Sequence, residues 1–337
     1  MKRKDYSISR GKTLGTCNRR HSSPTAMANR ILRPLSCFNP STLRWTPILS
    51  KSAQSQVRQS QLPQRLSLTS RFSIITWNVD FRSPRPVSRT NSILDYILKE
   101  PRTPDIIFLQ EVRSDVRASL LGNRKVREAF LTDAEDDKDK SFATMTLLST
   151  KRFASDLGDG IEGEEKFMVG PVSCVELPSA YGRDGLCVDI IPPTAPDTVF
   201  RLINVHLDSL ERLPYRTQQL EILAKVLREP GCSGGLIGGD FNSISPGDDE
   251  LVDKNGLVDA WLALHGSTDP DAPTWGVGRG REVGLKPKRL DKVAMMGLRA
   301  EEMEILPQGL IEVPKPGGDS ALLEWSDHSG LRCVFTI

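Results

Sequence analysis

Polar side chains that could bind a cation or move a proton follow apolar runs at three places in the sequence. Asn78 ends the run "IITWN", Glu111 follows "IIFLQ", and Asp240 and Asn242 end "LIGGDFN". Buried strands are rigid at such points, so side chains from several strand ends can converge on one cleft. A single Asn or Asp in this position commonly turns the chain. The repetition of the pattern is what indicates a shared site.

Two of the four histidines occur in the same kind of position. In "NVHLDS", strand alternation places His206 on one face together with Asn204 and Asp208. In "SDHSG", Asp327 and His328 stand side by side directly before the last apolar run. Each histidine taken alone could be a hydrogen-bonded structural residue, but together they add proton-carrying groups to the oxygen-rich strand ends.

Asp291, within "RLDKV", completes a set of oxygen donors that has no cysteine nearby. Such a set suits a hard divalent cation such as Mg²⁺, which is held by one or two carboxylates and keeps several waters. Zinc is disfavoured because paired His or Cys ligands are lacking. The Gly-rich run "GCSGGLIGGD" is not a P-loop, because no G-K-[ST] follows it. These residues therefore predict a magnesium site.

Strands and helices that alternate along the chain must position these residues. The segment "RTNSILDYILKE" spaces Ile93 and Ile97 by four, which indicates a helix between two buried strands. The order strand, helix, strand occurs in two halves of the body, with three strand candidates between them. This order predicts an α/β fold in which two sheets pack face to face with helices outside. Strands are expected at 72–80, 105–112, 141–150, 167–177, 185–191, 199–209, 234–242, 288–296 and 329–337, and helices at 89–100, 117–131, 215–229 and 257–264.

Basic residues gather at the N-terminal end of the sequence. From Met1 to Arg71 there are 14 Lys and Arg and one acid, Asp5, which leaves 31 basic and 42 acidic residues in the remainder. Residues 1–70 lack sustained periodicity and contain too few apolar residues to offset chain entropy, so we expect a disordered basic tail there. Its composition fits a mitochondrial transit segment, "KRK" fits a nuclear signal, and its charge fits contact with nucleic acid phosphates. The expected compartment is therefore the nucleus or the mitochondrion.

Residues 71–337 contain no linker-like stretch and are predicted to form one acidic catalytic domain. With 38% hydrophobic and 26% charged residues, the chain resembles soluble globular proteins. No apolar run approaches the roughly 18 residues that a membrane span needs. The six cysteines show no C-x-x-C pair, which indicates free thiols in a reducing compartment. Gly238 and Gly239 are expected to let the backbone pass close to a phosphate or a neighbouring strand.

In order along the chain, "TWNVD", "LQEV", "NVHLDS", "GGDFNS", "RLDKV" and "SDHSG" resemble the signature blocks of the endonuclease/exonuclease/phosphatase superfamily. These blocks run from residue 76 to residue 330. Among the branches, the chain is most similar to the 5′-tyrosyl-DNA phosphodiesterases. The resemblance implies a four-layer αββα sandwich of two mixed sheets. It also implies Mg²⁺- or Mn²⁺-dependent hydrolysis of phosphodiesters at DNA ends, above all of 5′-phosphotyrosyl adducts in DNA repair.

The resemblance assigns roles to the residues of these blocks. These roles agree with phosphoryl-transfer chemistry, in which a cation and a protonated His stabilise the developing charge while a carboxylate activates the attacking water. The resemblance implies metal binding by Glu111, Asn78 and Asp327, water activation by Asp240 and Asn242, phosphate stabilisation by His206 and His328 with Asp291 orienting His328, and substrate contacts by Ser209 and Arg216. A buried Asp291 would also raise the pKa of His328. Trp275 in "PTWGVG" is a further candidate for stacking a base, with simple burial as the alternative.

Other functions stay open at this point. "RLDKV" also resembles the corresponding block of abasic-site endonucleases, whereas inositol and lipid phosphatases of the superfamily carry Trp-Cys-Asp-Arg there. A non-catalytic binding module is a further alternative, although all of the catalytic residue types are present. The expected partners are DNA ends or protein–DNA adducts bound by a monomer. The acidic body argues against nucleic acid, and the basic run at 278–288 argues for it, with a flexible solvated loop as the alternative for this run.

Overall fold

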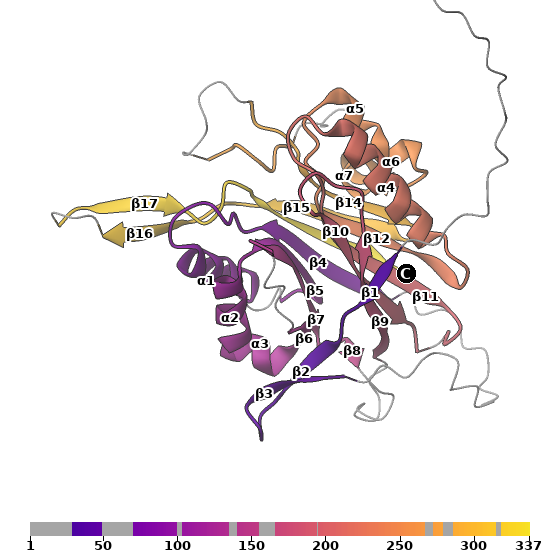
Figure 1. The fold of residues 1–337 in the computed structure, drawn as a ribbon, viewed down its shortest axis with the longest axis horizontal. Helices are drawn as coiled ribbons and strands as arrows, with labels where there is room; N and C mark the ends of the chain where they lie inside the picture. The colour runs from indigo at the N-terminus through magenta and orange to yellow at the C-terminus, as the bar shows by residue number, and fades with distance from the viewer. Residues whose placement is uncertain are drawn as a thin grey trace, which may run out of the picture.

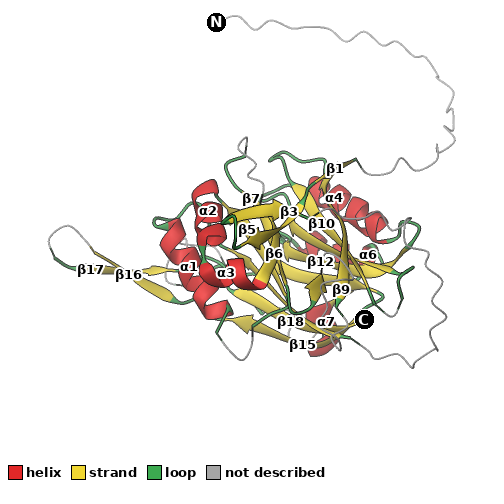
Figure 2. Ribbon diagram, turned by 90° about the horizontal axis from the view of Figure 1, so that it is seen from below, coloured by secondary structure: helices red, strands yellow, loops and turns green. Residues whose placement is uncertain are grey.

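A computed structural model of the chain describes residues 29–48, 70–99, 103–134, 140–154, 166–193, 195–266, 272–278, 286–314 and 318–337. Within these residues, two eight-stranded sheets pack face to face and helices cover their outer faces (Figures 1 and 2). Each sheet contains both parallel and antiparallel neighbours. The predicted α/β fold, a four-layer sandwich of two mixed sheets, is confirmed.

Sheet A has the strand order β1, β9, β10, β11, β12, β14, β13, and β8 pairs with β9 outside this path. Its central pair, β11 and β12, is parallel, while β14 runs antiparallel to β12. The strands of sheet A are β1 (Arg30–Leu32), β8 (Phe153–Ala154), β9 (Phe167–Glu176), β10 (Asp184–Ile191), β11 (Val199–His206), β12 (Cys232–Asp240), β13 (Val258–Asp259) and β14 (Asp291–Met296).

Sheet B has the strand order β15, β18, β4, β5, β7, β6, β2, β3. Here β4 and β5 form the parallel pair, and β18 joins β4 antiparallel. The strands of sheet B are β2 (Leu35–Asn39), β3 (Arg44–Pro47), β4 (Arg71–Asn78), β5 (Ile106–Val112), β6 (Phe130–Asp133), β7 (Ala143–Ser149), β15 (Arg299–Leu306) and β18 (Gly330–Thr336).

Helices lie on the outer face of each sheet, and Figure 2 shows α1–α3 on the opposite side of the molecule from α4 and α6. On sheet B, Ile93 of α1 is buried in one cluster with Trp77 of β4. On sheet A, Leu223 of α4 is buried in one cluster with Ile203 of β11. The helices are α1 (Pro86–Ile97), α2 (Ser114–Gly122), α3 (Arg124–Ala129), α4 (Leu213–Leu227), α5 (Pro246–Asp249), α6 (Leu251–Lys254) and α7 (Ala260–His265).

The glycines before Asp240 serve the packing of β12. At Gly239, where φ is 142°, a Cβ atom would lie 2.0 Å from the carbonyl oxygen of Val205 on β11. At Gly238, a Cβ atom would lie 3.3 Å from the ring of Phe108 in the other sheet. Of the two roles expected for these glycines, close approach to neighbouring strands is therefore the one that the structure shows.

The prediction that residues 1–70 are disordered is wrong for residues 29–48. In this segment β1 pairs with β9 of sheet A and β2 pairs with β6 of sheet B, so the segment passes from one sheet to the other. Leu35 is buried between the sheets, and Arg30 pairs with Glu229 at 2.5 Å. These contacts come from distant parts of the chain, which local composition does not reveal. Residues 1–28 and 49–69 lie outside the described part of the chain.

Three further details differ from the sequence-based expectations. The helix expected at 117–131 is divided into α2 and α3, because Asn123 is extended and its side chain accepts a hydrogen bond from the Lys125 N–H. The helix expected at 257–264 begins only at Ala260, after the short strand β13. Strand β15 and the hairpin of β16 (Leu310–Pro314) and β17 (Ser320–Glu324) were not expected.

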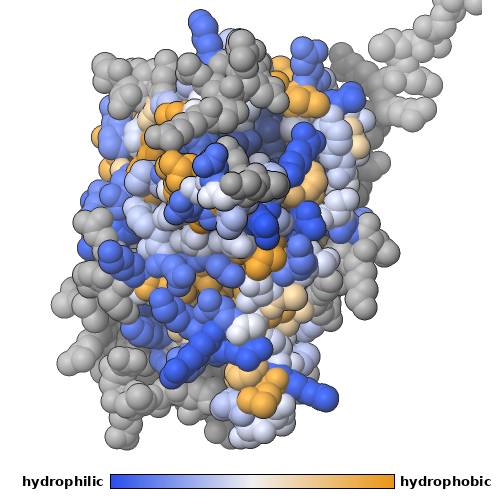
Figure 3. Space-filling view, turned by 90° about the vertical axis from the view of Figure 1, so that its left-hand side faces the viewer, coloured by the Kyte–Doolittle hydropathy of each residue, from blue (hydrophilic) through white to orange (hydrophobic). Residues whose placement is uncertain are grey.

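The β16–β17 hairpin projects from the body of the molecule (Figure 1). The end from which it projects is mainly hydrophilic, with hydrophobic side chains scattered over it (Figure 3). In the described part of the chain, no helix is long and apolar enough to cross a membrane. The cysteines described there are free thiols, as expected: Cys37, Cys174, Cys187, Cys232 and Cys333.

Candidate active site

Strand register brings the predicted residues of sheet A together. His206 is the partner of Asp240 across the parallel β11–β12 pair, and Asp240 is the partner of Asp291 across the β12–β14 pair. In sheet B, Asn78 at the end of β4 is the partner of Gln110, one residue before Glu111. The site lies where these strand ends of the two packed sheets meet.

Asp240 lies at the centre of this group and is buried. Its Oδ2 accepts a hydrogen bond from Asn78 Nδ2 at 3.0 Å, and its Oδ1 accepts one from the Asn242 backbone N–H at 2.8 Å. The Nε2 atoms of His206 and His328 lie 3.4 and 3.8 Å from Oδ2. Burial raises the pKa of Asp240, the positive charge of His328 opposes this, and the negative charge of Asp291 adds to it. A carboxylate poised in this way suits proton transfer.

Asp291 and His328 form a buried pair in which Nδ1 of the imidazole lies 2.8 Å from the carboxylate. Burial alone would lower the pKa of His328, but the carboxylates of Asp291, Asp327 and Asp240 outweigh it and raise the pKa well above the ordinary value. Asp291 is aligned in turn, because its backbone N–H donates to Thr274 Oγ1 at 3.0 Å. His328 is therefore held as a cation, as expected.

His206 is the electrostatic opposite of His328. Burial lowers the pKa of His206 well below its ordinary value, and the positive charges of Arg183 and His328 lower it further. Arg183 Nη1 lies 3.2 Å from Nδ1 of His206 and is a donor. Nδ1 therefore accepts, and the single ring proton is on Nε2, which lies toward Asp240 and is 3.8 Å from Glu111 Oε1.

Glu111 owes its direction to an irregularity in β5. The pairing of β5 with β7 shifts register between Leu109 and Val112, and Glu111 adopts a left-handed backbone conformation with φ 61°. Bulges of this kind re-aim a side chain and are frequent beside active sites. Glu111 Oε2 accepts a hydrogen bond from the Phe81 backbone N–H at 2.9 Å. Burial raises the pKa of Glu111, and the negative charge of Asp327 contributes to this.

The donor set of the site fits a divalent cation. Asp240, Asp291 and His328 each present a ligand-type atom, and these atoms lie within 4.8 Å of one another. A protonated imidazole offers no lone pair to an ion, so His328 is better placed to contact an anion. The oxygens of Glu111 and Asp327, with that of Asn78, remain as donors on the side of sheet B. The site holds more carboxylates than cationic imidazoles, so its charge favours a cation, and oxygen donors of this type suit Mg²⁺.

Asp327 and Trp275 lie beside His328 at the rim. The Asp327 side chain is 53% exposed, and its Oδ1 is 4.0 Å from His328 Nε2. Its Oδ2 accepts a hydrogen bond from Trp275 Nε1 at 3.0 Å. Trp275 also forms backbone bridges to His328 and Lys288. Trp275 is half-buried, and its indole N–H is occupied by Asp327. Its stacking on a base stays a prediction.

The structure does not support a substrate contact by Arg216, which is a correction to the sequence analysis. Its guanidinium is buried and donates to both oxygens of Asp248, at 2.6 and 2.8 Å, and to the carbonyls of Asp208 and Leu210, each at 2.8 Å. This pairing anchors the loop that follows β11. Ser209 in the same loop is half-buried, and its contact with substrate stays a prediction.

Two residues beside His206 escaped the sequence analysis. Arg183 precedes β10 and lies over the ring of Phe142, with its guanidinium carbon 5.0 Å from the ring centroid. The Phe142 ring also stacks on His206, with centroids 5.7 Å apart. Phe142 lies within the strand expected at 141–150, and Arg183 lies just before the strand expected at 185–191, but neither residue type indicated a site. The β10–β11 pairing within sheet A brings Arg183 beside His206, and the packing of sheet B on sheet A adds Phe142, which directly precedes β7.

Comparisons with known proteins agree with this geometry. The profile of the Endonuclease/Exonuclease/phosphatase family matches residues 75–328. No curated protein matches the chain. Among solved structures, D. rerio TDP2 complexed with single-strand DNA product has a TM-score of 0.57 at 22% identity, covering 80% of this chain and 100% of its own. TDP2 from C. elegans has a TM-score of 0.57 at 21% identity, covering 79% and 75%.

A more distant likeness has the same fold. The human Nocturnin catalytic domain with bound sulfate has a TM-score of 0.52 at 16% identity, and the match covers 79% of this chain and 95% of that domain. The family profile spans the blocks from "ITWN" to "SDH" that supply the residues converging on Asp240. The chain therefore belongs to the endonuclease/exonuclease/phosphatase family.

Proposed function

We propose that this protein is a Mg²⁺-dependent phosphodiesterase, with Mn²⁺ as an alternative ion, that acts on DNA ends and prefers 5′-phosphotyrosyl adducts. The observation that carries the proposal is the convergence on Asp240 of an amide from sheet B, a neutral imidazole and a cationic imidazole. Asn78, His206 and His328 all lie within 4 Å of its carboxylate. Such a set can activate a water and stabilise the charge that develops on phosphate oxygens.

Asp240 acts as the general base in this proposal. Its carboxylate takes a proton from water while the water oxygen bonds to phosphorus, and the bond from phosphorus to the leaving oxygen breaks. Asn242 holds the other carboxylate oxygen through its backbone N–H. His206 donates from Nε2 to a non-bridging phosphate oxygen, and the imidazolium of His328 stabilises the charge that develops there.

Glu111, Asn78 and Asp327 would hold the metal ion. When bound, the ion supplies positive charge to phosphate oxygens and favours ionisation of water. Glu111 is oriented for this by the Phe81 N–H, and Asp327 by Trp275 Nε1.

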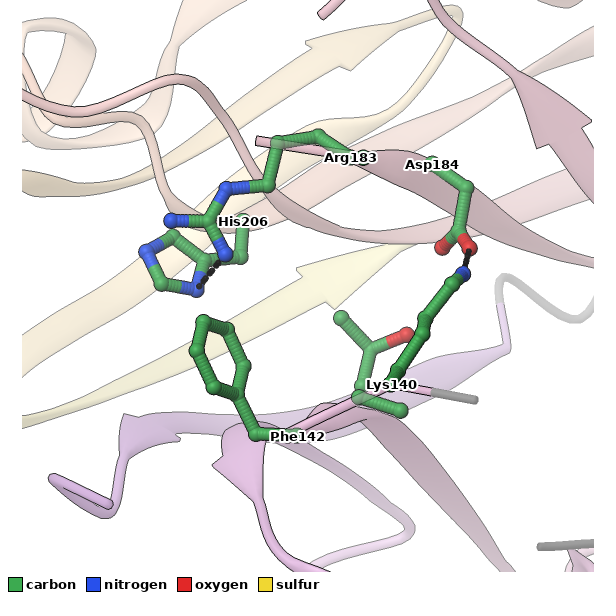
Figure 4. A pocket seen from close by; sticks show the side chains of 8 residues that line it. Lys140, Phe142, Arg183, Asp184 and His206 are labelled. Atoms are coloured by element: carbon green, nitrogen blue, oxygen red, sulfur yellow. Dashed lines mark hydrogen bonds and ion pairs between the residues drawn. The ribbon is translucent and has the colours of Figure 1, made fainter. Parts of the chain in front are cut away.

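An aromatic leaving group would lie over the mouth of a small pocket beside His206, whose volume of about 20 Å³ holds roughly one water. The pocket is lined by Lys140, Phe142, Arg183, Asp184 and His206, and Figure 4 shows these side chains around it, with Lys140 paired to Asp184 at the far side. Arg183 Nε is buried and has no partner among the described residues. A guanidinium and a phenyl ring suit a phenol ring better than they suit a sugar or an inositol. The DNA product in the TDP2 structure from D. rerio further supports a nucleic acid substrate.

The test is an assay of the purified protein with Mg²⁺ on a 5′-phosphotyrosyl oligonucleotide, an abasic duplex and an inositol polyphosphate. We expect the phosphotyrosyl oligonucleotide to be cleaved fastest. Asp240→Asn should lower kcat by about 10²- to 10⁴-fold. Asp115→Asn, which changes a half-exposed carboxylate on α2, is the matched control and should keep full activity.

The outcomes separate the alternatives. Cleavage of the abasic duplex alone would reassign the protein to the abasic-site endonucleases, and cleavage of the inositol polyphosphate alone to the phosphatases. Binding of DNA without cleavage of any substrate would indicate a binding module. Near-normal activity of Asp240→Asn would remove Asp240 from the role of base.

A further inference from the structure

We propose that Arg89 is a positioning residue for the candidate active site, because its guanidinium fixes together the two loops that orient Glu111 and His328. Arg89 lies on the first turn of α1, the helix at the lower left of Figure 1, and its Nη1 donates to the carbonyl of Val79, directly after β4. Its side chain is buried, with no exposed surface. The inference rests on the proposed function, since it concerns residues to which that function assigns catalysis and metal binding.

The guanidinium of Arg89 collects backbone carbonyls from two separate segments. All five of its N–H groups are used. Four bonds go to the loop after β4, and the fifth, at 2.6 Å, goes to the segment just before His328. The acceptors are the carbonyls of Pro84 (2.9 Å), Val79 (3.1 Å), Asp80 (2.6 Å), Ser83 (3.0 Å) and Trp325 (2.6 Å).

The first segment controls the metal-side carboxylate. The backbone N–H of Phe81, inside the loop that Arg89 holds, donates to Glu111 Oε2 at 2.9 Å. The N–H of Asp80 donates to Asn78 Oδ1 at 3.0 Å and so sets the amide whose Nδ2 contacts Asp240. Asp80 also has a left-handed backbone with φ 55°, which surrounding contacts must maintain. Loosening this loop would therefore release two of the proposed ligands.

The second segment controls the cationic imidazole. Directly after Trp325, Ser326 Oγ donates to the carbonyl of Asn78 at 2.6 Å and accepts from the His328 N–H at 3.0 Å. The carbonyl of His328 in turn accepts from Trp77 Nε1 at 3.0 Å. Arg89 thus donates hydrogen bonds both to the loop that orients Glu111 and to the segment that orients His328.

Lysine cannot reproduce this arrangement. It has three donors on a point charge instead of five in a planar fork, so it can satisfy at most three of the five carbonyls. Asp80 Oδ2 lies 3.6 Å from Arg89 Nη1, so a cation is still useful there and Lys should be accommodated. Arg89→Lys therefore separates the geometric role from the charge.

The experiment compares Arg89→Lys with Arg117→Lys. Arg117 is a matched control, because it is also a buried arginine on a helix of sheet B, α2, and donates to the carbonyls of Asp133 and Thr144, both at 2.8 Å. The melting temperature, the Mg²⁺ concentration that gives half of the thermal stabilisation, kcat and KM are measured for each. Loss of an outer partner of a metal site typically costs about 10- to 100-fold in metal affinity or activity.

We expect both variants to melt at a lower temperature than the wild type. Only Arg89→Lys should also need about tenfold more Mg²⁺ for half of the thermal stabilisation, and its kcat should fall by about 10- to 100-fold with little change in KM. An Arg89→Lys variant that loses stability but keeps the wild-type Mg²⁺ midpoint and kcat would overturn the proposal. Should Arg89→Lys fail to fold, Arg89→Gln, which keeps a planar side chain with two N–H donors, takes its place, and the same two outcomes decide. If the wild type cleaves no substrate, the proposed function fails, while the Mg²⁺ midpoints still test Arg89.

Discussion

A substitution of Arg216 distinguishes a structural role for this residue from a contact with the substrate. Replacing it by Met keeps most of the apolar stem and removes the guanidinium. The Asp248 carboxylate then loses two donors, at 2.6 and 2.8 Å, and keeps those from Ser245 N and Oγ. The carbonyls of Asp208 and Leu210 lose their donor as well. All of this occurs in a buried region, since Arg216 and Asp248 are 1% and 2% exposed.

The magnitude follows from leaving a buried charge without its partner. Breaking a buried ion pair on one side costs about 3–5 kcal/mol of unfolding free energy. In a domain of this size, each kcal/mol lowers the melting temperature by about 2–4 °C, so Arg216→Met should melt about 6–20 °C below the wild type. Because the side chain does not face the site, KM at a temperature well below melting should stay within about twofold of the wild type.

The assay pairs thermal unfolding with steady-state kinetics on a 5′-phosphotyrosyl oligonucleotide. Lys225→Met is the control, because Lys225 lies on the same helix but forms an exposed pair with Glu221, at 56% and 54% exposure. Such surface pairs contribute about 0–1 kcal/mol, so this control should melt near the wild type. An Arg216→Met variant with an unchanged melting temperature and a KM raised tenfold or more would show instead that Arg216 contacts the substrate.

Three further predictions concern the ion, the imidazolium and the N-terminal strands. Glu111→Ala should reduce the thermal stabilisation by Mg²⁺, and an unchanged response would remove Glu111 from the metal site. In EDTA, the raised pKa of His328 contributes stability that is complete below about pH 6.5 and is lost as the pH rises through the folded-state pKa. Asp291→Asn should therefore lose most stability near pH 6 and less at higher pH in urea unfolding, and a deficit independent of pH would contradict this. A chain beginning at Leu49 should be less stable in urea than one beginning at Asn29 by about 2 kcal/mol or more, since it loses buried Leu35, and equal stability would show that β1–β3 contribute little.

The central strands and the larger helices could be predicted because their patterns are local. β4, β5, β11 and β12 each contain a short apolar run, as is typical of strands buried on both faces. β15 escaped prediction because its sequence "RAEEMEIL" is rich in charge and it lies at the edge of sheet B. β1 and β2 escaped because their stabilising partners, β9 and β6, lie more than ninety residues away along the chain.

The types of the site residues were readable in the sequence, since carboxylates, amides and histidines after buried runs are visible without coordinates. Their mutual placement was not readable. That His206, Asp240 and Asp291 are direct neighbours follows from strand register, which depends on hydrogen bonds between distant segments. The opposite protonation of the two imidazoles follows from which charged group each one meets: Arg183 beside His206, and Asp291 beside His328.

The sequence by itself thus reveals the types of the candidate catalytic residues, because they follow apolar runs at strand ends. Local periodicity is also enough to assign the α/β fold. The backbone of Glu111, the burial of Arg216 against Asp248 and the five carbonyls gathered by Arg89 are set only when the two sheets pack with their helices. The physical reason is that direction, burial and charge environment are properties of contacts between segments far apart in sequence, whereas residue type and periodicity are properties of the segments themselves.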